Sequence, residues 1–215
     1  MIKKIFLIIL FLSLLYTKGN SQWIQQSPYP TGNTLSSSAI LDENTFIAVG
    51  GYGTIIKTTN AGINWSLLSI GAGETFYSVH FINSNTGWAA GDYRKLYKTT
   101  NKGINWLPQS LPTFTNEQRS VFFINENTGW IGGTSLIKTT NGGNNWLSIN
   151  IFPAWLITSI YFADENSGWA CSFNGKIIKT TNGGTNWVQN ELNNNTAALH
   201  AIKFTNINTG WATGD

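Results

Sequence analysis

TTNAGINW at residues 58–65 recurs as TTNKGINW at 99–106, TTNGGNNW at 139–146 and TTNGGTNW at 180–187. The tryptophans that close these four stretches lie 41, 40 and 41 residues apart. A second element, NTGW or NSGW, keeps the same phase and ends at Trp88, Trp130, Trp169 and Trp211. Self-similarity at a fixed period of this length is typical of repeat architectures. The sequence therefore predicts an array built from one supersecondary unit.

The segments between these markers have strand composition rather than helical periodicity. One unit holds four such runs, which we name strands A to D, at residues 78–81, 87–91, 95–99 and 106–110. Four strands in each repeat match the blade of a β-propeller, whereas a helical solenoid would show a period of 3.6 residues. The predicted fold class is all-β, a β-propeller of four-stranded blades.

The TTNxGxxW stretch should form the hairpin between strands C and D. An Asn side chain can fold its oxygen onto the amides of its own turn, and a Gly accepts a positive φ. The tryptophan is then expected to bury its ring against the sheet or the next blade. A structural role is favoured over a ligand role for all twelve positions, which are Asn60, Gly62, Trp65, Asn101, Gly103, Trp106, Asn141, Gly143, Trp146, Asn182, Gly184 and Trp187.

These hairpins resemble the Asp-box, written S-x-D-x-G-x-[TS]-W. Together with the GW-A-x-G and K-[TS]-T elements, the pattern is most similar to the photosystem II assembly factor-like propellers, and more distantly to sortilin-type and sialidase propellers. This chain has Asn where the motif has Asp, in every copy. An amide oxygen accepts the same hydrogen bonds without carrying charge. The resemblance implies a noncatalytic scaffold with protein partners, and it is the only link to photosynthesis.

The repeat phase places four full blades at about 34–70, 75–110, 118–150 and 157–190. A fifth blade starts near Leu199 and ends at Asp215, inside the blade. Residues 21–27 align with a lone D strand. Either an imperfect five-bladed ring forms or the chain is a fragment of a larger propeller, and we favour the fragment because no capping change precedes the break.

The N-terminus reads as a secretory signal at residues 1–21, followed by the propeller at 22–215. Lys3 and Lys4 precede an apolar run over residues 5–15, and small residues follow at a cleavage site. A membrane anchor would need about 20 apolar residues. We therefore expect export to the periplasm, cell surface or outside, with no membrane span after cleavage.

The charge balance of the predicted mature chain argues against nucleic acid as a partner. Removing Lys3, Lys4 and Lys18 from 13 basic residues leaves 10, against 10 acidic ones. A neutral domain without a basic run lacks the electrostatic footprint of nucleic-acid binding. No motif suggests a cofactor, and His80 and His200 fall in different columns of the repeat. Cys171 aligns with the small residues Ala48, Ala90, Gly132 and Thr213. No metal ligand or catalytic residue is therefore predicted.

The variable connections mark a candidate recognition face. The A to B turns and the C to D hairpins repeat closely, whereas the D to A and B to C connections, on the opposite edge of each blade, differ. Trp155 lies outside the repeat register, and its role as a binding anchor or as a packed residue stays open. The candidates are Tyr77, Arg119, Thr158 and His200, which share one column at the channel mouth, with Tyr93, Arg94, Trp155 and Phe173.

Three functions fit this face. The first is a noncatalytic scaffold that binds a protein. The second is glycoside hydrolysis, although sialidases use three arginines at their substrate carboxylate and this chain has only Arg94 and Arg119. The third is glycan binding through exposed aromatic side chains.

Overall fold

The computed structural model describes residues 30–70, 73–151, 155–190 and 197–215. Within them every regular element is a strand, apart from one 3-10 turn at Gly51–Gly53. The predicted signal at 1–21 and the lone D strand at 21–27 lie outside the described residues, as do parts of three D to A connections.

Four antiparallel sheets have the predicted order A, B, C, D, and a two-stranded sheet follows them. Blade 1 consists of β1 (Leu35–Ile40), β2 (Phe46–Gly50), β3 (Thr54–Thr58) and β4 (Ser66–Ser69). Blade 2 consists of β5 (Phe76–Phe81), β6 (Gly87–Gly91), β7 (Leu96–Thr99) and β8 (Leu107–Gln109). Blade 3 consists of β9 (Gln118–Phe123), β10 (Gly129–Gly133), β11 (Leu136–Thr139) and β12 (Leu147–Ile149). Blade 4 consists of β13 (Ile157–Phe162), β14 (Gly168–Ser172), β15 (Ile177–Thr180) and β16 (Val188–Asn190), and the partial blade 5 of β17 (Leu199–Asn206) and β18 (Thr209–Gly214).

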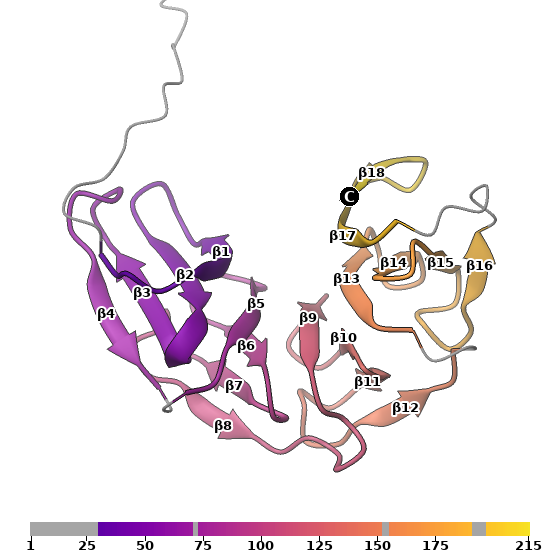
Figure 1. Cartoon of the computed structure of the whole chain (residues 1–215), viewed down its shortest axis with the longest axis horizontal. Helices are drawn as coiled ribbons and strands as arrows, with labels where there is room; N and C mark the ends of the chain where they lie inside the picture. Colours follow the sequence, from indigo (N-terminus) through magenta and orange to yellow (C-terminus); the bar gives the residue numbers. More distant parts are fainter. Residues whose placement is uncertain (1–29, 71–72, 152–154, 191–196) are drawn as a thin grey trace, which may run out of the picture.

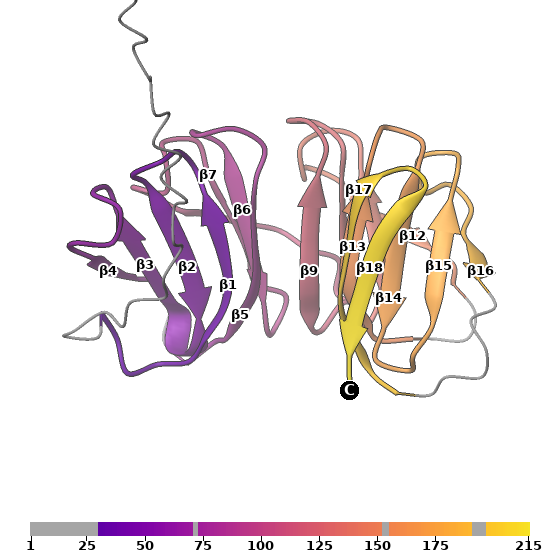
Figure 2. The same cartoon turned by 90° about the horizontal axis from the view of Figure 1, so that it is seen from above.

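The blades form an open arc (Figure 1). The A strands β1, β5, β9, β13 and β17 line its inner side, and the D strands β4, β8, β12 and β16 lie on its rim. In the view from above (Figure 2), the strands of successive blades run in roughly the same direction, along the thickness of the arc. The predicted fold class, four full blades and a partial one, is confirmed.

Each hydrophobic core cluster is one interface between neighbouring blades. The B strands are buried on both faces because each blade is covered on two sides; all five residues of β6, β10 and β14 are buried. At three interfaces a B-strand tryptophan stacks on a phenylalanine in the A strand of the next blade. The pairs and their centroid distances are Trp88–Phe123 at 3.6 Å, Trp130–Phe162 at 3.6 Å and Trp169–Phe204 at 3.8 Å.

A serine in the A strand of each of blades 1 to 4 accepts a hydrogen bond from the next blade, a contact that no sequence pattern predicted. The serine Oγ accepts the backbone N–H of the following A strand. The four bonds are Val79 N to Ser37 Oγ at 3.1 Å, Val121 N to Ser78 Oγ at 3.1 Å, Ile160 N to Ser120 Oγ at 3.0 Å and Ile202 N to Ser159 Oγ at 3.2 Å. We call this contact the serine latch. It satisfies a backbone donor that would otherwise lose its partner at the interface.

The C to D hairpins have the predicted structural role and one further component. In blade 1 the Asn60 Oδ1 accepts the Asn64 N–H at 2.9 Å, and the Thr58 hydroxyl both donates to Asn60 and accepts the Gly62 N–H. The same bonds recur in the other three hairpins. The threonine two residues before each Asn therefore completes the turn.

Three of the four hairpin tryptophans pack as expected. Trp106, Trp146 and Trp187 each lie edge-on to a phenylalanine in the A strand of their own blade. Trp106 also belongs to the core cluster that joins blades 1 and 2.

The strand register confirms that Cys171 fills a small buried position and corrects one of its equivalents. Cys171 faces Ser159 across the ladder, as Ala90 faces Ser78 and Val49 faces Ser37. The blade 1 equivalent is therefore Val49 and not Ala48. Burial raises the pKa of the Cys171 thiol, which keeps the side chain protonated and unreactive.

Candidate recognition face

Backbone hydrogen bonds tie the variable connections together on one edge of every blade. The first residue of each B to C turn donates its N–H to the carbonyl of the residue before strand A. The five bonds are Gly51 to Thr34, Asp92 to Thr75, Thr134 to Glu117, Phe173 to Leu156 and Asp215 to Ala198. The A to B turns are bonded in the same way to the C to D hairpins, on the other edge. The predicted division into two faces is thus present, and we call the variable one the loop face.

The predicted column at the mouth is formed by β-bulges in the A strands. The pairing register skips Tyr77, Arg119, Thr158 and His200 in β5, β9, β13 and β17. It also skips Ser36 in β1, which is not among the predicted recognition residues. A bulge leaves one residue outside the ladder and re-aims its side chain, so one mechanism presents all five residues at the same edge.

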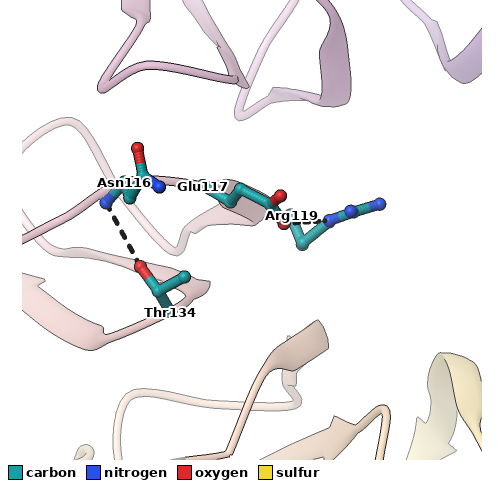
Figure 3. Close-up of polar contacts among 4 residues, drawn as sticks. All are labelled: Asn116, Glu117, Arg119 and Thr134. Carbon is teal, nitrogen blue, oxygen red and sulfur yellow. Dashed lines mark hydrogen bonds and ion pairs between the residues drawn. The ribbon is translucent and has the colours of Figure 1, made fainter.

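The structure brings Tyr77 and Arg119 together. The Arg119 guanidinium carbon lies 4.0 Å from the centre of the Tyr77 ring, which is cation–π geometry. Arg119 Nε also donates to Glu117 Oε2 at 2.9 Å (Figure 3). Burial and then the Asp92 carboxylate raise the pKa of Tyr77 to about 12, against the opposing effect of Arg119. The phenol is therefore neutral at physiological pH and can act as a donor.

A second group joins blades 4 and 5. The Phe173 ring lies 6.2 Å from the His200 ring, edge to face. His200 Nε2 contacts Asp215 Oδ1 at 3.1 Å. Asp215 holds the same turn position as Asp92, so a carboxylate accompanies the bulge residue in both blades. Thr158 has a different role, because its hydroxyl donates to the Leu199 carbonyl at 2.6 Å and so links two blades.

Tyr93 and Arg94 lie further out, in the B to C turn of blade 2. Both residues have a positive φ, and Tyr93 is 69% exposed. Arg94 Nη1 donates to the Thr113 carbonyl at 3.3 Å. Tyr52 holds the equivalent position in blade 1, also with a positive φ and 70% exposed. The aligned stretches GGYG and GDYR could have revealed it from the sequence.

Trp155 is not a surface residue, and its inclusion in the recognition face was wrong. It is 7% exposed and packs in the core cluster with Trp130 and Leu136 between blades 3 and 4. Its burial supports the packing interpretation that the sequence had left open.

Three carboxylates on the loop face contact basic side chains. Glu74 Oε1 lies 3.0 Å from Lys95 Nζ, Glu117 pairs with Arg119, and Asp215 with His200. The bond from Lys95 lowers the pKa of Glu74, whereas a general acid at neutral pH needs a raised one. Among the residues that the structure describes, no group of three His, Cys, Asp or Glu side chains could hold a metal ion.

Comparison with known proteins gives the family resemblance. Residues 57–156 match the family model described as photosynthesis system II assembly factor YCF48. Over this segment, which is a little under half of the chain, the sequence is similar to the photosystem II assembly factor-like propellers. Among curated proteins, no sequence is a significant match.

Solved structures agree on the fold. YCF48 bound to D1 peptide is 15% identical, with a TM-score of 0.55 over 86% of this chain and 92% of that one. Virginiamycin B lyase from Staphylococcus aureus is 14% identical, with a TM-score of 0.73 over 88% and 66%. The GH74 enzyme of Niastella koreensis is 17% identical, with a TM-score of 0.63 over 78% and 31%. Identities this low show the propeller fold and leave the activity open.

Proposed function

We propose that this protein is an exported, noncatalytic propeller that binds a protein partner on its loop face. The observation that carries the proposal is the Tyr77–Arg119 pair, held at the mouth by Glu117 and Asp92. The match to an assembly factor family, and a related structure named as bound to a peptide, support the same class of partner.

The loop face has the side chains that protein interfaces favour. Tyrosine, phenylalanine and arginine are enriched at interfaces, and tyrosine and arginine dominate their energetic centres. Tyr52, Tyr93 and Phe173 expose 70%, 69% and 51% of their area on this face. The Arg119 side chain is already ordered by two neighbours, so binding costs less conformational entropy there.

A displayed library of unstructured peptides tests the proposal. We expect enriched peptides whose binding weakens at least about tenfold in Arg119→Ala and Phe173→Ala, since truncating an interface anchor costs above about 1.4 kcal/mol. Glu126→Ala and Asn144→Ala, exposed on the opposite edge, are the matched controls. Failure to enrich any peptide, or equal losses in the controls, would refute the proposal.

A carbohydrate function is the alternative, because a GH74 enzyme and a lyase share the fold. Turnover of sialyl or β-glucan substrates, abolished by changing Glu117 or Asp92, would replace the scaffold proposal with a hydrolase. A glycan array would separate binding without turnover from both.

Export is the remaining part of the proposal. It rests on the N-terminal pattern at residues 1–21. No helix in the described part of the chain is long and apolar enough to cross a membrane. We expect N-terminal sequencing of the exported protein to begin at Gln22; a chain that starts at Met1 in the membrane fraction would favour the anchor.

A further inference from the structure

Three asparagines of this chain are followed directly by glycine, at Asn141, Asn174 and Asn182. In such a pair the glycine backbone nitrogen can attack the side-chain carbonyl carbon of the asparagine, because glycine has no Cβ to obstruct the approach. Ammonia leaves and a succinimide ring forms. Water then opens the ring to give aspartate or isoaspartate, so the net reaction consumes water and releases ammonia. The sequence alone makes the three positions equal candidates for this reaction.

The blade 3 hairpin holds both reacting groups of its Asn-Gly pair in hydrogen bonds. The Asn141 Oδ1 accepts the Thr139 hydroxyl at 3.0 Å and the Asn145 N–H at 2.9 Å. The nucleophile is engaged as well, because the Gly142 N–H donates to the Asn127 carbonyl at 2.8 Å. The blade 4 hairpin has the equivalent bonds, at Asn182 and Gly183. Attack would require these bonds to break, so the two hairpins oppose the reaction.

Asn174 has a different environment, in the B to C turn of blade 4. The turn joins β14 and β15, the two central strands of a complete blade, and Asn174 is exposed in it. None of the residues that the structure describes forms a hydrogen bond with the Asn174 side chain. The Gly175 N–H donates to the Ser172 carbonyl at 3.1 Å, within the turn itself. The Asn174 side chain can therefore rotate toward the Gly175 nitrogen without losing a hydrogen bond of its own.

We propose that Asn174 is a site of spontaneous modification, at which the folded protein converts asparagine to aspartate or isoaspartate while Asn141 and Asn182 stay intact. Water is the co-reactant, and no enzyme is required. Either product adds a negative charge to the loop face, next to Phe173, whose side chain is 51% exposed. A modification that changes charge alters the contacts available to a partner. The loop face therefore becomes more acidic as the protein ages, whichever partner it binds.

Incubation of the folded protein at neutral and at mildly alkaline pH, followed by peptide mapping with tandem mass spectrometry, tests the proposal. The exchange of an amide for a hydroxyl group should be found at Asn174 and should be absent at Asn141 and Asn182. It should accumulate faster at the alkaline pH, because the attacking backbone nitrogen must lose its proton. Native isoelectric focusing should show an additional, more acidic band. Asn174→Gln should lose that band, since its longer side chain would have to close a less favourable ring.

The unfolded chain is the matched control. In guanidinium chloride the hairpin hydrogen bonds are lost, so Asn141, Asn174 and Asn182 should all be modified at comparable rates. An Asn174 that stays unchanged in the folded protein, over a time in which the unfolded chain reacts, overturns the proposal. Modification of Asn141 or Asn182 as fast as that of Asn174 in the folded protein overturns it as well. Peptide binding at the loop face enters none of these readouts.

Discussion

At the scale of single residues, Gln118 departs most from the repeat. It is fully buried at the start of β9, and neither its side-chain oxygen nor its nitrogen has a hydrogen-bond partner. The equivalent residues of the other A strands are Leu35, Phe76, Ile157 and Leu199. A buried polar atom without a partner costs about 1–3 kcal/mol. The Gln118 amide is therefore expected to lower the stability of the folded protein, at a position that is apolar in the other four A strands.

Gln118→Leu should stabilise the protein by about 1–2 kcal/mol, because it removes the unpaired amide at nearly constant volume. Urea unfolding measures the change. The reciprocal control, Ile157→Gln, should destabilise by about 2–4 kcal/mol. A Gln118→Leu protein less stable than the parent would mean that the amide has a partner in solution.

Tyr77 should ionise at a higher pH than an ordinary tyrosine. Burial and the Asp92 carboxylate raise its folded pKa to about 12, above the ordinary value of 10.0. Its stabilising contribution is thus fully present below pH 10 and is lost as the pH rises through about 12. Alkaline absorbance titration should show a late step that disappears in Tyr77→Phe. A titration complete near pH 10 would contradict the buried environment.

At the scale of elements, the C to D hairpins differ at the residue that precedes the turn glycine. The residue before the turn glycine has a positive φ in all four copies. It is glycine at 142 and 183, but Ala61 and Lys102 in blades 1 and 2, with φ of 54° and 60°. A Cβ in this conformation costs about 1–2 kcal/mol. The first two hairpins therefore carry backbone strain that the last two avoid.

Ala61→Gly should stabilise blade 1 by about 0.5–1 kcal/mol, since the relief of strain exceeds the entropy cost of glycine. Gly183→Ala is the matched control and should destabilise, because its Cβ would also come within 2.8 Å of the Glu165 carbonyl oxygen. Thermal unfolding of both variants gives the comparison. Equal midpoints for all three proteins would show that the φ values carry no cost.

At the scale of the whole molecule, the serine latches couple neighbouring blades. Repeat arrays owe their stability to the repeats and to the interfaces between them. Ser120 accepts the Ile160 N–H across the interface of blades 3 and 4, where the serine is buried. We therefore expect this hydrogen bond to contribute to the cooperativity of unfolding.

Ser120→Ala should lower the free energy of unfolding by about 1–3 kcal/mol, because it leaves a buried backbone donor unpaired. It should also broaden the urea transition as blades 3 and 4 uncouple. Ser148→Ala, at an exposed position of β12, should change neither quantity. If the urea transition of Ser120→Ala were identical to that of the parent, the serine latch would make no contribution to the stability of the arc.

The sequence by itself determined the repeat, the four-stranded blade and the hairpin turns. These depend on local chemistry, since Asn60 and Gly62 shape a turn through atoms at most four residues apart. The column at the mouth also followed from the repeat phase, because equivalent residues occupy equivalent places.

Only the tertiary structure decided which side chains make contacts between neighbouring blades. Tyr77 meets Arg119 from another blade, and the serine latches join residues about 40 apart in sequence. The burial of Trp155 and Gln118 likewise depends on a neighbouring sheet. No pattern within one repeat encodes such contacts, because the packing energy comes from surfaces that are brought together when the blades assemble around the axis.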